Sequence, residues 1–79
     1  MNVTLWMQPG NRPSEQAEMA LKFRNIAYEE KRIGYNVTMD DFLAQFPNTS
    51  ELPQVIIDNT NIGSYQQLED YLIEHWKLP

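Results

Sequence analysis

The chain has 79 residues, 42% of them hydrophobic, with no cysteine and a net charge of −5 from 6 basic and 11 acidic side chains. This length predicts one small domain spanning residues 1–79, and the hydrophobic fraction is too high for a disordered chain. The acidic balance disfavours nucleic acid, and without a secretion signal or a membrane-length apolar stretch we expect a cytoplasmic protein with no membrane partner.

The first part of the sequence predicts a strand, a turn and a helix. Residues 3–7 contain β-branched and aromatic side chains without a breaker, which is typical of a strand, and Pro9-Gly10 ends it. A helix is expected to begin between Asn11 and Ser14, because both are good N-cap residues and Pro13 suits a first helical turn.

The middle of the sequence predicts a strand, a short helix and a further strand. Residues 26–33 contain the strand, whose weak alternation suits an edge or a wet face. Thr38 is expected to cap the short helix, with Asp41 near the capping-box position. Residues 54–57, with the run Val-Ile-Ile, form the most strand-like segment of the chain.

The last part predicts a hairpin followed by a helix. Residues 58–61 are expected to form the turn, and Ile62 the start of a short antiparallel return strand. Ser64 and Gln67 have the spacing of a capping box at the start of the last helix. The resulting order is β-α-β-α-β-β-α, and the first strand-helix-strand unit should be parallel with a right-handed crossover.

The chemistry-bearing residues do not form a catalytic or metal-binding motif. His75 is the only histidine and has neither a cysteine nor a second histidine as a fellow ligand, so a surface or packing role is expected. Ser14 has no histidine placed to act as its base, and helix capping is the favoured role. The adjacent pairs Asp40-Asp41 and Glu69-Asp70 point in different directions on a helix and are interpreted as solvated faces.

Several segments, in their order and spacing, resemble a glutaredoxin over essentially the whole chain. The matching segments are Pro9-Gly10, Tyr28-Glu29-Glu30, Leu52-Pro53-Gln54-Val55-Ile56-Ile57-Asp58, Ile62-Gly63-Ser64-Tyr65 and Leu68. Residues 42–48 are similar to the corresponding segment of small phage-type glutaredoxins. The resemblance implies an α/β thioredoxin-like fold with a central four-stranded mixed sheet flanked by helices.

The departures from the family pattern fall on its reactive groups. Asn11 and Ser14 stand where the family has its two cysteines, so the nucleophilic thiolate and the resolving thiol are both missing. Other family positions concerned with glutathione have also changed: Gln8 replaces a lysine, Gln66 an aspartate and Ser64 a glycine. Leu52 replaces the valine before the family's cis-proline. We therefore predict no catalytic residues and no metal.

Part of the family's binding groove has counterparts in this chain. The candidate binding residues for a glutathione-like or peptide ligand are Gln8, Arg12, Leu52, Pro53, Gly63 and Ser64. The resemblance implies a cis Pro53 that presents the backbone of Leu52 to a peptide, and a carboxylate site on the backbone N–H groups near Gly63. The alternatives are a Pro53 that only sets the strand entry, a Gly63-Ser64 turn that only caps a helix, and an Arg12 that is only a solvated charge.

These observations favour a glutaredoxin-like protein that is redox-inactive and acts by binding a protein or peptide. The alternative is a member or variant of the active glutathione-dependent thiol-disulfide oxidoreductases, which serve cell redox homeostasis and donate electrons to ribonucleotide reductase. No cofactor is expected. The resemblance implies glutathione as a ligand, but the lysine and aspartate that would hold it are replaced in this chain, so its binding is not favoured. A monomer or weak homodimer is expected.

Overall fold

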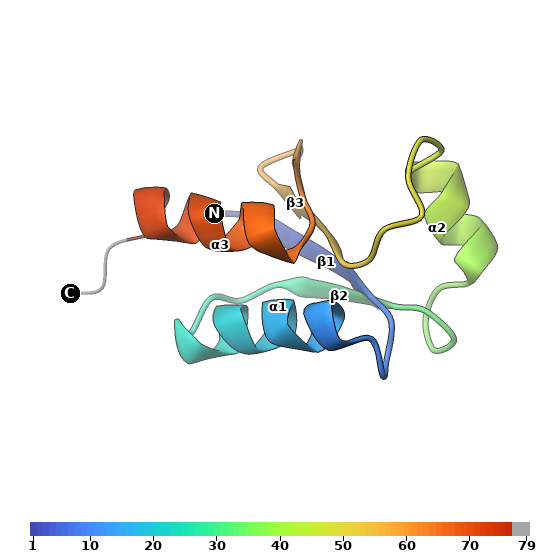
Figure 1. Ribbon diagram of the computed structural model, residues 1–79, viewed down its shortest axis with the longest axis horizontal. Coiled ribbons are helices and arrows are strands. Elements are labelled where there is room, and N and C mark those ends of the chain that lie inside the picture. The colour runs from blue at the N-terminus through green and yellow to red at the C-terminus, as the bar shows by residue number, and fades with distance from the viewer. Residues whose placement is uncertain (77–79) are drawn as a thin grey trace.

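The computed structural model describes residues 1–76 and has the predicted order of strands and helices (Figure 1). The elements are β1 (Val3–Met7), α1 (Arg12–Phe23), β2 (Glu29–Arg32), α2 (Met39–Gln45), β3 (Gln54–Ile57), β4 (Thr60–Gly63) and α3 (Tyr65–His75). None of the helices within the described residues is long and apolar enough to cross a membrane.

The four strands form one mixed sheet in the order β2-β1-β3-β4. β1 pairs in parallel with β2, as expected for the first strand-helix-strand unit, and antiparallel with β3. β3 and β4 form the predicted antiparallel hairpin. The predicted fold class, a thioredoxin-like arrangement with a central four-stranded mixed sheet flanked by helices, is confirmed.

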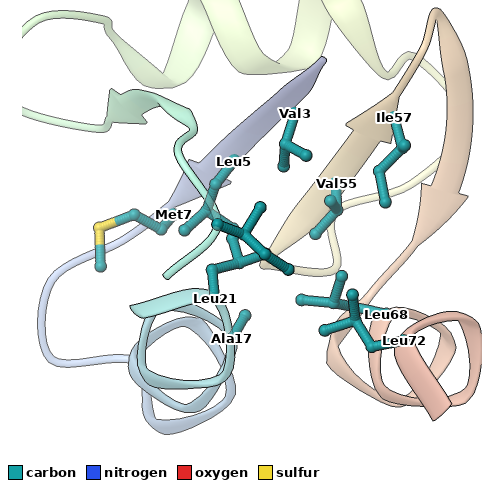
Figure 2. Close-up of a cluster of buried hydrophobic side chains, with 10 residues drawn as sticks. Val3, Leu5, Met7, Ala17, Leu21, Val55, Ile57, Leu68 and Leu72 are labelled. Atoms are coloured by element: carbon teal, nitrogen blue, oxygen red, sulfur yellow. The ribbon is translucent and has the colours of Figure 1, made fainter. Parts of the chain in front are cut away.

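The main core lies between one face of the sheet and the helices α1 and α3. Figure 2 shows Leu5 and Val55 on the strands pointing toward Leu21 of α1 and toward Leu68 and Leu72 of α3. All five side chains are fully buried. Burial of each such side chain contributes about 1.5–3 kcal/mol, so this layer supplies most of the hydrophobic stabilisation and fixes both helices against the sheet.

A second, aromatic cluster covers the other face of the sheet at one end. The ring of Trp6 meets the ring of Phe46 edge-on at 5.7 Å, and the rings of Phe42 and Phe46 are 5.2 Å apart. Leu52 and Ile33 are buried in the same cluster. The cluster therefore holds α2 at the end of the molecule where Figure 1 shows it, and it anchors the segment that leads into β3.

The hairpin turn is shorter than the sequence predicts. Asp58 and Asn59 have φ angles of 50° and 69°, and these two residues alone reverse the chain. Asp and Asn tolerate this left-handed conformation, which the favoured two-residue hairpin turn requires. Thr60 and Asn61, predicted as part of the turn, consequently lie in β4. The prediction of a four-residue turn from 58 to 61 is wrong by these two residues.

A group of charged side chains joins α1 to the edge strand β2. Arg32 lies 3.5 Å from the Glu30 carboxylate and 3.9 Å from that of Glu18. A hydrogen bond between the two carboxyl groups lowers the pKa of Glu18 and raises the pKa of Glu30. Burial, with the neighbouring charges of Glu18 and Glu30, raises the pKa of Tyr28 to about 12. The phenol is thus held neutral where α1 meets β2.

We predict that Tyr28 makes the fold weaker in strong alkali. The unfolded chain loses the phenol proton near the ordinary pKa of 10.0, whereas the folded protein keeps it until about 12. The stabilisation is therefore complete below about pH 10 and declines as the pH rises toward 12, because the unfolded state then binds fewer protons. Urea unfolding of the wild type and of Tyr28→Phe at about pH 9 and about pH 11 measures this effect. An equal loss of stability in both proteins would contradict it.

Candidate functional site

The fold brings the predicted binding residues to one end of the sheet. Gln8 follows β1 directly, and the segment Leu52-Pro53 enters β3, whose first residue Gln54 pairs with Trp6. Because the two strands are antiparallel, the residues just before β3 lie beside those just after β1. Gly63 pairs with Val55 and places the start of α3 near the same end. Figure 1 shows the starts of α1 and α3 directed toward the end of the sheet near α2.

The two residues at the family's cysteine positions build the turn into α1. The side-chain oxygen of Asn11 accepts a hydrogen bond from the Ser14 N–H at 2.9 Å, so Asn11 is the N-cap, as predicted. Ser14 lies inside the helix instead, fully buried, and its hydroxyl accepts a hydrogen bond from the Gln8 N–H at 3.2 Å. Both residues therefore have structural roles, and the bridge from Ser14 to Gln8 has no local signal in the sequence.

Arg12 is the first residue of α1 and is exposed to solvent. The ion pairs among the described residues do not include it. A helix N-terminus carries partial positive charge, so a cation in the first turn is unfavourable by about 0.3–1 kcal/mol. Within residues 1–76, Arg12 is thus a cation without an ion-pair partner at the helix start, in the same first turn as the acidic Glu15.

Leu52 combines an anchored side chain with an unpaired backbone. The residue is 7% exposed, and its side chain packs in the aromatic cluster. Within residues 1–76, its N–H and C=O groups make no backbone hydrogen bond. The peptide bond between Leu52 and Pro53 is cis, as the resemblance implies. The structure therefore fixes the position of Leu52 and leaves its N–H and C=O groups without a backbone partner in this part of the chain.

The start of α3 is covered by one of its own side chains. The Ser64 N–H donates to the side-chain oxygen of Gln67 at 3.1 Å, which is the capping-box contact that the sequence predicts. Gln67 also lies close over Gly63, whose φ is +118°, and a Cβ at that position would come within 3.1 Å of the Gln67 side chain. A neutral amide oxygen thus occupies a backbone donor that the resemblance assigns to a carboxylate.

A polar pocket of about 350 Å³ lies beside this helix start. Its lining includes Gln54, Glu51, Gln67 and Ser64. Gln54 is only 5% exposed, and its amide nitrogen donates to the Glu51 carbonyl at 2.9 Å. The sequence prediction of the site did not include Gln54 or Glu51, and it assigned Gln67 only a capping role. For Gln54 the reason is that a buried amide on a strand carries no local pattern that distinguishes it from an exposed one.

The site contains no group that could perform thiol chemistry. The chain has no cysteine, and the hydroxyl of Ser14 is buried in its bond with the Gln8 backbone. His75 lies exposed at the end of α3, where its ring centroid is 4.3 Å from that of Tyr71, a placement consistent with the predicted surface or packing role. Among residues 1–76 there is no group of three histidine or acidic side chains that could hold a metal ion.

Comparison with known proteins places this fold. No protein-family model matches the chain, and no curated protein sequence matches it either. Glutaredoxin 1 from Francisella tularensis, solved in complex with cacodylate, is similar with a TM-score of 0.78 at 21% identity, covering 92% of this chain and 93% of that chain. Reduced Escherichia coli glutaredoxin gives a TM-score of 0.68 at 17% identity, with 95% and 96% covered.

A third similar structure shares the fold with only part of its length. A diazinon-metabolizing glutathione S-transferase of the silkworm Bombyx mori gives a TM-score of 0.75 at 16% identity, covering 98% of this chain and 39% of that chain. At these identities the likeness defines the class of fold. The protein has the thioredoxin-like fold in the form found in glutaredoxins, and it has this form without any cysteine.

We predict that Asn11→Ala lowers the free energy of unfolding by about 1 kcal/mol, because the Ser14 N–H loses its cap. Asn11→Asp is the matched control: its carboxylate retains an acceptor and suits the helix N-terminus, so its stability should stay close to the wild type. Urea unfolding followed by circular dichroism measures both. An alanine variant as stable as the wild type would show that the cap does not hold the turn.

Proposed function

We propose that this protein is a redox-inactive binding module of glutaredoxin fold, which holds an extended segment of a partner protein across Leu52 and the start of α1. The observation that carries this proposal is the state of Leu52, whose side chain is buried while its backbone N–H and C=O have no backbone partner within the described residues. Strand-like pairing with such a backbone is a common mode of peptide recognition.

Arg12 supplies the second argument for this surface. It lies at the start of α1, where the helix dipole already favours negative charge, and it has no counter-ion among the described residues. The positive charge of Arg12 and the dipole of α1 both attract an acidic group. A partner segment that pairs with Leu52 and carries a carboxylate near Arg12 would satisfy both, and the protein's own acidic surface would disfavour phosphate-rich partners.

The proposal also covers the ligands and partners that the protein is not expected to bind. Glutathione is a poor candidate ligand, because Gln67 already occupies the Ser64 N–H and no lysine stands at position 8. We further propose a cytoplasmic location, a monomer or weak homodimer, and no nucleic-acid or membrane partner. Redox homeostasis is then a property of the proteins that share this fold and have retained their cysteines.

We predict that the wild type does not reduce a glutathione mixed disulfide, and that Asn11→Cys/Ser14→Cys stays inactive too. The restored cysteines would supply the nucleophile, but the changed glutathione positions and the folded-back Gln67 would still oppose glutathione binding. A coupled thiol-transferase assay measures both proteins against an active glutaredoxin. Turnover by the wild type would refute redox inactivity, and strong turnover by the double variant would favour the alternative of a variant enzyme.

We predict that peptides selected from a random display library on the immobilised protein will shift the amide signals of Gln8, Arg12 and Leu52. Arg12→Glu should weaken their binding by about tenfold, because an attraction becomes a repulsion. The same variant should be more stable by about 0.3–1 kcal/mol, since an acid suits the helix N-terminus. Lys22→Glu, on an exposed position of the last turn of α1, is the charge-matched control. Binding that maps elsewhere, or is equally weakened by Lys22→Glu, would contradict the proposal.

A further inference from the structure

The polar pocket beside the start of α3 has features of a recognition site for a side chain. Amide and hydroxyl groups dominate its lining, which includes Gln54, Gln67 and Ser64. Glu51 is the only charged residue among the described residues that line it. The composition favours a ligand that exchanges several hydrogen bonds over one that needs an apolar surface.

Gln54 connects the pocket to the interior of the protein, because it lines the pocket and is nearly buried. This residue is 5% exposed, and its side-chain amide nitrogen donates a hydrogen bond to the Glu51 carbonyl at 2.9 Å. Within residues 1–76 its side-chain oxygen accepts no hydrogen bond, although the residue lines the pocket. Trp76 Nε1 is the only fully buried side-chain polar atom without a partner among the described residues, so the Gln54 oxygen is accessible to solvent. It can therefore accept a hydrogen bond from a donor placed in the pocket.

Two features of the pocket oppose an anion. The Ser64 N–H, which an anion would use at the start of α3, already donates to the Gln67 oxygen at 3.1 Å. Glu51 also lines the pocket, and its negative charge would repel a second one. A carboxylate ligand would therefore have to displace Gln67 and also approach Glu51.

A cationic ligand would gain little affinity from the charges around the pocket. The exposed Glu51 carboxylate attracts it, with an effect of about two- to fivefold in affinity for a solvent-exposed ion pair. The positive end of the α3 dipole repels it by a similar two- to fivefold factor. The two fields approximately cancel, and the remaining penalty is the desolvation of the charge. A neutral group avoids that penalty and still bonds with Gln54.

We propose that this pocket binds an uncharged carboxamide. In the complex it would accept the side chain of an asparagine or glutamine in the bound partner segment, with the amide N–H donating to the Gln54 oxygen. This inference deepens the proposed function and rests on it for the identity of the partner. The affinity of the pocket for a free carboxamide can be measured without any partner.

Three planar molecules of the same size and different charge test the pocket directly: acetamide, acetate and acetamidinium. Each is titrated into the ¹⁵N-labelled protein near neutral pH at fixed ionic strength, with the amide signals of Gly63, Ser64 and the Gln54 side chain as reporters. Acetamide should bind about threefold or more tightly than either ion, which corresponds to one additional modest hydrogen bond. Equal or tighter binding of acetate or acetamidinium, or no shift with any of the three, would overturn the inference.

A pair of neighbouring glutamines on α3 provides the matched variants. Gln67→Ala frees the Ser64 N–H, so acetate binding should become about threefold tighter. Gln66→Ala is the control, because Gln66 is exposed, bonds to Asp70 and does not line the pocket. It should leave all three affinities unchanged. An unaltered acetate affinity in Gln67→Ala would refute the role assigned to Gln67.

The outcomes separate this inference from the proposed function. Display peptides that shift Gln8 and Leu52 without preferring a carboxamide at the pocket support the binding module and reject the pocket assignment. If the protein binds acetamide preferentially but selects no peptide at Leu52, the pocket assignment is supported and the peptide groove is rejected.

Discussion

The position of β1 between two strands is the constraint on which the rest of the structure depends. β1 uses its backbone groups on both sides, toward β2 and toward β3, while Leu5 and Trp6 enter the cores on opposite faces of the sheet. The chain leaves the sheet at Gln8, just after β1, and the Gln8 N–H donates to the buried Ser14 hydroxyl. That bond sets the start of α1, and the antiparallel pairing of β3 sets Leu52 beside it.

The replacements at the candidate site share a physical consequence. In glutaredoxins, as the resemblance implies, the N-termini of these helices face a thiolate and a carboxylate. Here the oxygen of Asn11 takes the Ser14 N–H, and the oxygen of Gln67 takes the Ser64 N–H. Neutral side chains of the protein itself thus satisfy donors at both helix starts. Arg12 remains as a positive charge beside the turn, so any preference of this surface for acidic groups rests on it and on the dipole of α1.

The features that the sequence predicts correctly are those that depend on residues close together in the chain. The order of elements and both capping boxes could be predicted, because a strand pattern or an i, i+3 pair lies within a few residues. The predicted hairpin turn is too long, since Thr60 and Asn61 have a turn-like composition, whereas the left-handed Asp58 and Asn59 alone reverse the chain. The roles of Gln54 and of Ser14 depend on burial and long-range pairing, and neither has a local signature.

The aromatic cluster connects the candidate site to the packing of α2. Leu52 shares this cluster with Phe42 and Phe46 of the α2 region, and Trp6 of the central strand contacts both rings. A segment that pairs with the Leu52 backbone would favour the conformations in which Leu52 is packed. Such a ligand stabilises the folded state by mass action, and part of that effect would appear as tighter docking of α2. Protection of the α2 amides from hydrogen exchange should therefore rise with occupancy of the groove, although α2 contributes none of the predicted binding residues.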